Sequence, residues 1–384
     1  MKNKLLIGVG EMFEGAVDPS VTPEQVSYLT AAMGFGTMRV WTHHSDLLYL
    51  GKNGEPCLND DKVALYKKQL KTLIDGGVRH LVGMNHCYLY PEGFVASAFN
   101  VVPLPESEYY KPFLEIQTKS CKLLAETFGE ILYWEIGNEI NADRFLAKPG
   151  FPSSGLAEGA GGAELNFTLD EKAQITVDIC KYSVLGVKQG NRKAKSVLPS
   201  PAGDGATVAA FVDKMYGLMG GRYRDYFDIL SCHPYNFDGQ FDRLIAYCNL
   251  IKKVADNRGD KNLEMYLTEY GYYDDDLMKF GLSRSESDIR QAAYLVGDME
   301  AIKQKLPYVT AIHIFRLLDW HTGPGMEMTF GLFASPDTDT GIIPKAKGLA
   351  LYKYINGADA DIRKLYKYAK INVQGDKEYL GLPS

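Results

Sequence analysis

The chain has 384 residues, of which 46% are hydrophobic and 23% charged, and its formal net charge at pH 7 is −6. This acidic balance argues against a nucleic-acid partner, because proteins that bind nucleic acids usually present a basic face. No run of about 18 apolar residues occurs, so the sequence predicts no membrane span. The composition is that of a globular protein with a large core.

The six cysteines follow no pattern that is typical of a disulfide framework or a metal site. They stand at positions 57, 87, 121, 180, 232 and 248, without a CxxC pair. A core of this size needs no disulfide bonds, so we expect free and mostly buried thiols. The first apolar run, residues 5–9, is too short for a signal peptide. The cytoplasm is therefore one expected location, and export with a removed leader is the other.

Short apolar runs that are typical of strands alternate with longer amphipathic stretches along the whole chain. The runs begin near Leu5, Thr37, His80, Ile131, Ser196, Asp228, Glu264 and Val309. Capping boxes open helices at Thr22 and Thr168. Asn59 is expected to cap a helix over 60–74, and apolar positions recur at helical spacing over 284–305. This alternation predicts a (β/α)8 TIM barrel of parallel strands.

We expect one catalytic barrel to occupy residues 1–384 as a single domain. Two connections, near 88–107 and 141–167, are long enough to shape a substrate groove. A short C-terminal tail is expected after about residue 358.

Two glutamates stand at the ends of apolar runs, Glu139 in the run 131–139 and Glu269 in the run 265–271. A carboxylate beside a buried strand is costly unless it is paired or used in chemistry. If they end the fourth and seventh strands, both lie at the carboxyl ends, where barrel active sites are built. Each motif alone is more typical of a turn or a helix cap. Together they form the pair of carboxyl groups that cleaves a glycosidic bond.

Polar and aromatic residues also mark the ends of other predicted strands. They are Arg39 and Trp41 on the second strand, His86 on the third, Asn138 on the fourth, His233 and Tyr235 on the sixth, and Trp320 on the eighth. With the two glutamates, and apart from Trp41, this set resembles the active-site signature of retaining glycoside hydrolases of clan A, and most closely that of family 5. Glu135 matches the structural glutamate that precedes the Asn-Glu pair in that family. Families 39, 51 and 53 are not excluded, because Ile140 stands where family 5 usually has a proline.

The resemblance implies a retaining glycosidase that acts on an oligo- or polysaccharide and needs no cofactor or metal. Glu139 would be the acid/base and Glu269 the nucleophile, which must stay ionised in order to attack. Arg39 and Tyr235 are suited to hold Glu269 in its charged form. His233 is expected to hydrogen-bond near Glu139.

The remaining members of the set are expected to contact the sugar. Asn138 can donate to the 2-hydroxyl beside the reacting carbon. Trp320 and Trp41 offer flat apolar faces for sugar rings, and His86 is expected to line the same site. The resemblance also implies that Trp320 precedes a non-proline cis peptide bond.

Two other functional classes stay open. A barrel that binds glycans without turnover is disfavoured, because both glutamates are present. A metal-dependent hydrolase would need ligands such as the His-Cys pairs at 86–87 and 232–233, but adjacent residues of a strand point to opposite sides. The pair His43-His44 is expected to lie in a solvated loop, with sugar contact as its functional alternative.

Overall fold

The computed structural model describes residues 5–13, 21–98, 100–151, 166–236, 238–273, 281–319, 329–334 and 342–366. Trp320 lies outside these ranges, as do residues 152–165 of the second expected long loop and the tail beyond residue 366. The extent of the single domain and of its loops therefore stays a prediction.

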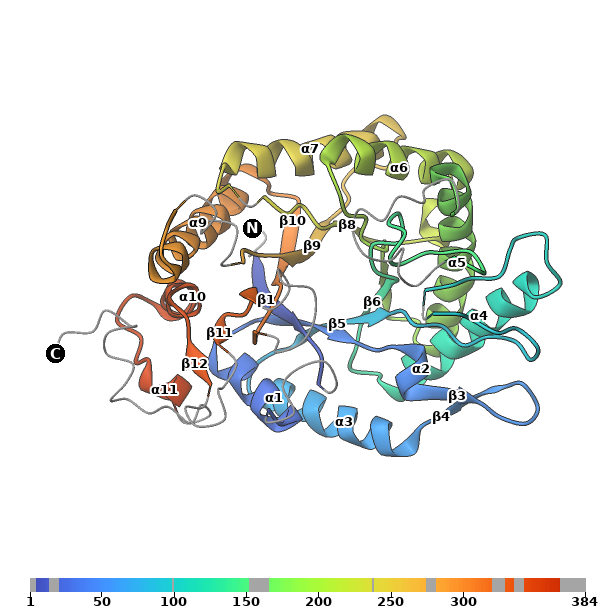
Figure 1. Ribbon diagram of the computed structural model, residues 1–384, viewed down its shortest axis with the longest axis horizontal. Coiled ribbons are helices and arrows are strands. Elements are labelled where there is room, and N and C mark those ends of the chain that lie inside the picture. The colour runs from blue at the N-terminus through green and yellow to red at the C-terminus, as the bar shows by residue number, and fades with distance from the viewer. Residues whose placement is uncertain are drawn as a thin grey trace.

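Eight parallel strands form a barrel that is surrounded by helices (Figure 1). The strands are β1 (Leu6–Glu11), β2 (Thr37–Trp41), β5 (His80–Asn85), β6 (Tyr133–Ile136), β7 (Lys195–Val197), β8 (Leu230–Cys232), β9 (Met265–Tyr270) and β10 (Val309–Ile314). Their order in the sheet is β7-β6-β5-β2-β1-β10-β9-β8, and a parallel bridge between Val197 and Ile229 joins its two edges. The predicted TIM barrel is confirmed, and all eight predicted runs are its strands.

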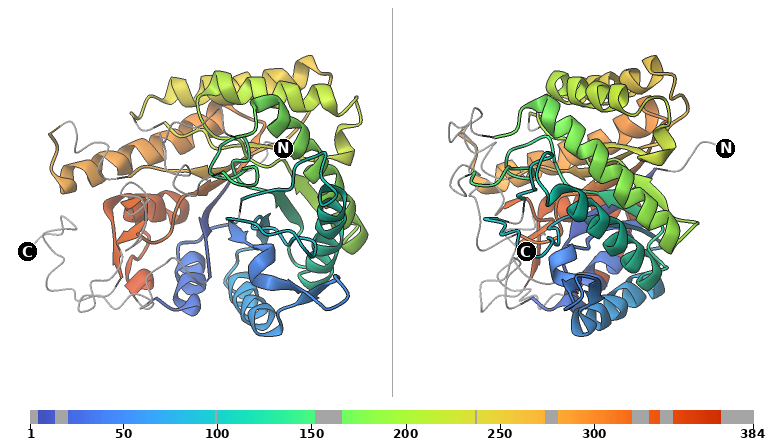
Figure 2. Two further views of the ribbon diagram at one scale, coloured as in Figure 1. Left: turned by 45° about the vertical axis from the view of Figure 1, so that its right-hand side comes forward. Right: turned by 90° about the vertical axis from the view of Figure 1, so that its right-hand side faces the viewer.

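The helices cover the outside of the barrel (Figure 2). They are α1 (Pro23–Ala32), α2 (His44–Leu47), α3 (Asp60–Asp75), α4 (Tyr110–Thr127), α5 (Leu169–Gly190), α6 (Gly205–Leu218), α7 (Phe241–Asn257), α9 (Arg284–Lys305), α10 (Ala346–Asn356) and α11 (Arg363–Tyr366), with the 3-10 helix η3 (Tyr223–Asp225). Capping boxes at Thr22 and Thr168 are confirmed, and Asn59 accepts a hydrogen bond from the Lys62 amide. Local sequence signals therefore set where these helices begin.

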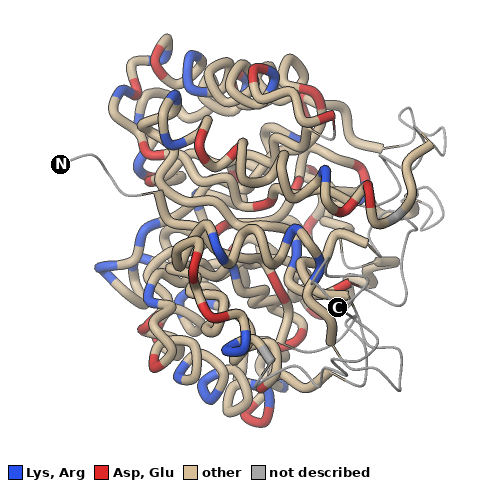
Figure 3. The backbone as a smooth tube through the Cα atoms, turned by 90° about the vertical axis from the view of Figure 1, so that its left-hand side faces the viewer, with Lys and Arg blue, Asp and Glu red and all other residues tan. Residues whose placement is uncertain are grey.

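Two short hairpins add to the barrel. One joins β3 (Leu48–Leu50) to β4 (Pro56–Leu58), and the other joins β11 (Phe333–Ala334) to β12 (Ile343–Pro344). The sequence analysis missed both, because strands of two or three residues carry too little alternation to be recognised. Acidic and basic residues are interspersed along the outer helices (Figure 3). Among the described helices, none is long and apolar enough to cross a bilayer.

The barrel interior changes character along its axis. Its amino-terminal end is filled by an apolar cluster of Val82, Val197, Ile229, Tyr266 and Ala311. Beside this cluster, the Thr37 hydroxyl is hydrogen-bonded to His80 (2.9 Å) and His313 (2.8 Å). Beyond this layer the interior side chains are charged, and these charges form the candidate active site.

Candidate active site

Arg39 is the centre of the polar group at the carboxyl end of the barrel. Its side chain is fully buried and donates to three residues, two from the end of β6 and one from β9. Nε donates to Glu135 Oε2 (2.5 Å), Nη1 to Glu269 Oε1 (2.6 Å) and Nη2 to Asn138 Oδ1 (2.6 Å). Burial alone would lower the pKa of Arg39, but the charges of Glu135 and Glu269 outweigh it and raise the pKa. Arg39 therefore fixes both carboxylates and the Asn138 amide.

Glu269 lies near the end of β9 and is held in its ionised form. Its second oxygen, Oε2, accepts a hydrogen bond from the Tyr235 hydroxyl (3.0 Å). Burial raises the pKa of Glu269, yet the positive charges of His233 and Arg39 and the hydrogen bonds from Arg39 and Tyr235 lower it overall. At neutral pH this side chain is a carboxylate, and the hydrogen bonds from Arg39 and Tyr235 fix its orientation.

A β-bulge explains how Glu269 and its neighbour both reach the barrel centre. The register between β9 and β10 shifts so that Leu267 to Tyr270 face Ile312 to Ile314, which leaves one extra residue on β9. Bulges of this kind re-aim side chains beside active sites. Thr268 donates to Glu135 Oε1 (2.8 Å), while Glu269 contacts Arg39.

Glu139 lies three residues beyond the end of β6 and faces Glu269. Its side chain is 17% exposed, against 8% for Glu269. Its φ of 46° is in the left-handed region that residues with a side chain seldom adopt. The Glu139 amide donates to the Ser200 carbonyl (2.9 Å), which fixes this turn against the end of β7.

His233 lies between the two glutamates. Nδ1 is 2.7 Å from Glu139 Oε1 and 3.6 Å from Glu269 Oε2, and Nε2 is 3.0 Å from Thr268 Oγ1. Burial lowers the pKa of His233, but the charges of Glu269 and Glu139 raise it overall. One carboxylate oxygen of each glutamate and one ring nitrogen of His233 all lie within 4.8 Å of one another.

Two hydroxyl residues that the sequence analysis did not single out complete the support of Glu135. Ser200 donates to Glu135 Oε1 (2.6 Å) and is also hydrogen-bonded to Thr268. Glu135 is fully buried, so these bonds and Arg39 compensate its desolvation. Ser200 follows the short strand β7. Its place after a strand of the barrel is the only sequence signal that could have identified it as a site residue.

Of the aromatic residues expected at the site, Trp41 and Tyr235 lie within the described part of the chain. Trp41 and Tyr235 pack against Tyr273, Phe315 and Phe330 at the mouth of the barrel. Phe315 is the first residue after β10, and the described non-proline cis peptide bond joins it to Arg316. Trp320 and the bond that follows it lie outside the described residues. Phe315 therefore occupies the strand end at which the sequence analysis expected Trp320.

The histidines near β2 and β5 pack together beside the site. The ring of His86 is 5.3 Å from that of Tyr88 and 5.8 Å from that of Phe145, and burial lowers its pKa well below the ordinary value. The prediction that His43-His44 lies in a solvated loop is wrong for His44, which begins α2 and is buried. Its amide donates to the His86 carbonyl (3.0 Å), and burial lowers its pKa to about 4. His44 is therefore a neutral packing residue.

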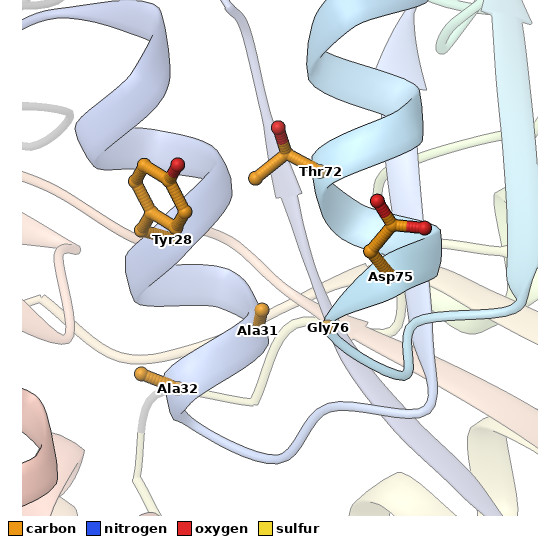
Figure 4. Close-up of a pocket in the computed structure, with 6 residues that line it drawn as sticks. All are labelled: Tyr28, Ala31, Ala32, Thr72, Asp75 and Gly76. Atoms are coloured by element: carbon orange, nitrogen blue, oxygen red, sulfur yellow. The ribbon is translucent and has the colours of Figure 1, made fainter.

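Of the cavities in the described part of the chain, two lie towards opposite ends of the barrel. One of about 390 Å³ lies between α1 and α3, and Figure 4 shows Tyr28, Thr72 and Asp75 around it. It lies where these helices end, and such ends face the amino-terminal side of a barrel, away from the glutamates. The other, of about 590 Å³, has Tyr235 in its wall and therefore borders the site.

Comparison with solved structures supports the same architecture. A β-glycosidase from the hyperthermophile Thermosphaera aggregans superposes with a TM-score of 0.62 and 14% identity over 96% of this chain and 99% of that one. A broad-specificity endoglucanase of family 5, subfamily 4, from Clostridium acetobutylicum gives a TM-score of 0.58 and 12% identity over 91% and 97%. The chain has the fold of these glycoside hydrolases.

A family 39 glycoside hydrolase from the gut symbiont Bacteroides cellulosilyticus WH2 is also similar, with a TM-score of 0.59 and 17% identity. The match covers 92% of this chain but 64% of that enzyme, so this chain spans less than two thirds of its length. No protein-family model and no curated protein sequence matches the chain. These similarities establish the fold of the chain and do not establish its chemistry.

Proposed function

We propose that the protein is a retaining glycoside hydrolase in which Glu139 is the acid/base and Glu269 the nucleophile. The observation that carries the proposal is the approach of the two carboxylates to within 4.8 Å. Retaining enzymes hold their carboxyl groups about 5–5.5 Å apart, whereas inverting enzymes need roughly 6.5–9.5 Å to admit a water molecule. The spacing of Glu139 and Glu269 therefore favours double displacement.

The surroundings of the two glutamates support this division of roles. Arg39 and Tyr235 hold Glu269 ionised, as a nucleophile requires. The side chain of Glu139 is more exposed than that of Glu269. It is hydrogen-bonded to His233, whose imidazole can itself take up and release a proton. In the first step, Glu269 would attack the anomeric carbon while Glu139 protonates the departing oxygen. In the second, Glu139 would take a proton from water, which attacks the same carbon and releases Glu269.

Asn138 is oriented for the sugar by Arg39. Because Nη2 of Arg39 donates to Asn138 Oδ1, the amide NH2 of Asn138 remains as the donor. This group would donate to the 2-hydroxyl of the sugar, a contact that strengthens in the transition state. Trp41 would contribute a flat face near the same ring.

The test is hydrolysis of a panel of aryl glycosides and oligosaccharides, with NMR analysis of the anomer that is released first. Retention of configuration is expected, and inversion would overturn the double displacement. Glu139→Ala should keep most of its kcat/KM on substrates with good leaving groups and lose more on poor ones, because only the latter need a proton. Its kcat should fall on both, because the second step loses its base. Azide should partly restore the turnover of this variant, and the product should be a glycosyl azide of retained configuration.

A metal-dependent hydrolase is the second candidate, because Glu139, His233 and Glu269 are close enough to share a cation. The Arg39 guanidinium, 2.6 Å from Glu269, disfavours a cation at this point. Full activity after treatment with a chelator would exclude the metal-dependent mechanism. Binding of glycans without turnover by the wild-type protein would instead identify a binding barrel.

A further inference from the structure

Lys172 is a buried lysine at the start of α5, the helix beside β6 that follows Glu139 along the chain (Figure 1). Its side chain is only 6% exposed. Two effects disfavour a lysine at this position, because burial desolvates the ammonium group and the amino-terminal end of a helix dipole repels a positive charge. The neighbouring Asp170 and Glu171 are the residue types that suit a helix start. The contacts of Lys172 must therefore offset an unfavourable location.

The ammonium group of Lys172 holds the segment that comes directly after Glu139. Nζ donates to the Asn141 carbonyl (3.1 Å) and to the Asp143 carboxylate. Asn166, which precedes α5, donates from Nδ2 to the same oxygen of Asp143 (2.8 Å). Two side chains thus fix this segment against the start of α5.

The fixed segment is continuous with the turn that carries Glu139. The Ala142 amide donates to the Glu139 carbonyl (2.7 Å). Asn141 bonds both backbone groups of Ala202, since its Nδ2 donates to the carbonyl (2.7 Å) and its Oδ1 accepts from the amide (3.0 Å). With a φ of 46°, Glu139 keeps its conformation only because the surrounding structure holds it. The carbonyl that Lys172 binds therefore belongs to a residue that supports this turn.

We propose that Lys172 is a positioning residue, which acts through Asn141 and Asp143 to hold the carboxyl group of Glu139 beside Glu269. The inference rests on the proposed function, in which Glu139 is the acid/base. A displacement of about 1 Å in a reacting group can lower a rate about 10²-fold. A loosened turn should therefore weaken the transfer of a proton from Glu139 to the departing oxygen.

The other end of α5 provides a matched control. Lys188 also donates to one backbone carbonyl, that of Ala194 (2.7 Å), and to one carboxylate, that of Asp228 (2.7 Å). It lies in the last turn of the helix, and its partners precede β7 and β8. Helices of a barrel run opposite to its strands, so this end faces the amino-terminal side, away from Glu139. Lys188 makes the same kinds of bond as Lys172 at the far end of the barrel.

The test compares Lys172→Met and Lys188→Met with the wild type on two glycosides of the sugar that the substrate panel identifies. A dinitrophenyl glycoside departs with little help from an acid, whereas a phenyl glycoside needs it. The measured quantity is kcat/KM for the phenyl glycoside divided by kcat/KM for the dinitrophenyl glycoside. In Lys172→Met this ratio should fall about tenfold, because general acid catalysis contributes about 10²–10⁴-fold and a misplaced acid loses part of it.

Two further variants separate positioning from stability. Lys188→Met should keep the wild-type ratio even where its melting temperature falls. Lys172→Arg keeps a positive charge and several donors, so it should recover part of the ratio that Lys172→Met loses. A role of Lys172 in stability alone would lower the melting temperature and leave the ratio unchanged.

The outcomes distinguish failure of the positioning role from failure of the proposed function. If the wild type hydrolyses no member of the substrate panel, the proposed function fails, and the role of Lys172 fails with it. If the wild type is active and Lys172→Met lowers both kcat/KM values by one factor, the positioning role alone is overturned. An equal fall of the ratio in Lys188→Met would also overturn it, because the effect would then follow stability.

Asp143→Asn replaces Lys172→Met in this test if the latter does not fold. The Asp143 side chain is 37% exposed, so its neutral form should be tolerated. The ratio should fall about threefold, because a charge-assisted hydrogen bond from Lys172 becomes a weaker neutral one. An unchanged ratio in Asp143→Asn would then overturn the proposal.

Discussion

Glu11 and Glu269 are each paired with a buried arginine at the carboxyl end of the barrel. The two carboxylates differ in how completely they are buried and hydrogen-bonded. Glu11, the last residue of β1, is fully buried, and Arg316 donates to both of its oxygens. The amides of Met12 and Leu318 donate to the same two oxygens. Glu269 is also paired with a buried arginine, Arg39, but its side chain remains 8% exposed and faces Glu139.

Under the proposed function, this difference distinguishes a structural carboxylate, Glu11, from a reactive one, Glu269. Glu11 connects β1 to the chain after β10, so its hydrogen bonds join the first and last strands of the barrel. Arg39 instead holds two carboxylates, Glu135 and Glu269, and the second of these opens towards the site. Four predictions test whether this distinction is correct, from the largest expected effect to the smallest.

Replacement of Glu269, the proposed nucleophile, should have the largest effect. Glu269→Gln keeps the shape of the side chain but removes the attacking oxygen, so kcat/KM on an aryl glycoside should fall at least about 10³-fold. The melting temperature should change much less than the rate. Wild-type turnover by this variant would show that Glu269 is not the nucleophile.

Removal of the arginine that serves both carboxylates should damage activity and stability together. Arg39→Met leaves Glu135 and Glu269 without their positive partner, so the free energy of unfolding should fall by about 3–5 kcal/mol. Activity should fall at least about a hundredfold, because Glu269 is no longer aimed or held ionised. Arg39→Lys keeps the positive charge but cannot make all three hydrogen bonds of the guanidinium. Its stability and its activity should lie between those of the wild type and of Arg39→Met.

The structural pair should lose stability without losing chemistry. Glu11→Gln removes the buried negative charge that pairs with Arg316, and denaturant unfolding should show a loss of about 3–5 kcal/mol. At a temperature where the variant is folded, its kcat/KM should stay within about threefold of the wild type. A large loss of kcat/KM in the folded variant would mean that Glu11 also takes part in the site.

The pH dependence of stability should show the smallest effect. The pKa of Glu269 is lowered by folding, so its contribution is present above the unfolded value of about 4.3 and is lost as the pH falls through the folded pKa. The pKa of His233 is raised, so its contribution is present below about 6.5 and is lost as the pH rises through the folded pKa. Melting temperatures of wild type and His233→Gln should therefore differ most between about pH 4.3 and 6.5, where His233 is charged and the glutamates are ionised, and converge as the pH rises. A constant difference across this range would contradict the coupling of His233 to the glutamates.

The barrel could be predicted from the sequence because its signals are local. Strand runs, capping boxes and their alternation are read from a few neighbouring residues, and Thr22, Asn59 and Thr168 begin helices as expected. The juxtaposition of Arg39, Asn138 and Glu269 followed from barrel register, which places strand ends side by side. These features need no knowledge of packing.

The parts that were missed depend on contacts between distant segments. The bulge that turns Thr268 inward is a property of the pairing of β9 with β10, so alternation along β9 does not reveal it. Burial of His44 depends on the segment after β5, whose carbonyl at His86 accepts its amide. The cavity beside Tyr235 arises from two loops and a helix, which come together only in the folded barrel.

The backbone conformation at Glu139 has a consequence for how this protein balances durability against activity. With a φ of 46°, position 139 would suit asparagine or glycine better than glutamate. Selection for a robust fold alone would therefore remove the glutamate from this turn. If Glu139 is the proposed proton donor, the chain gives up part of its folding free energy to keep this carboxyl group where a substrate can reach it.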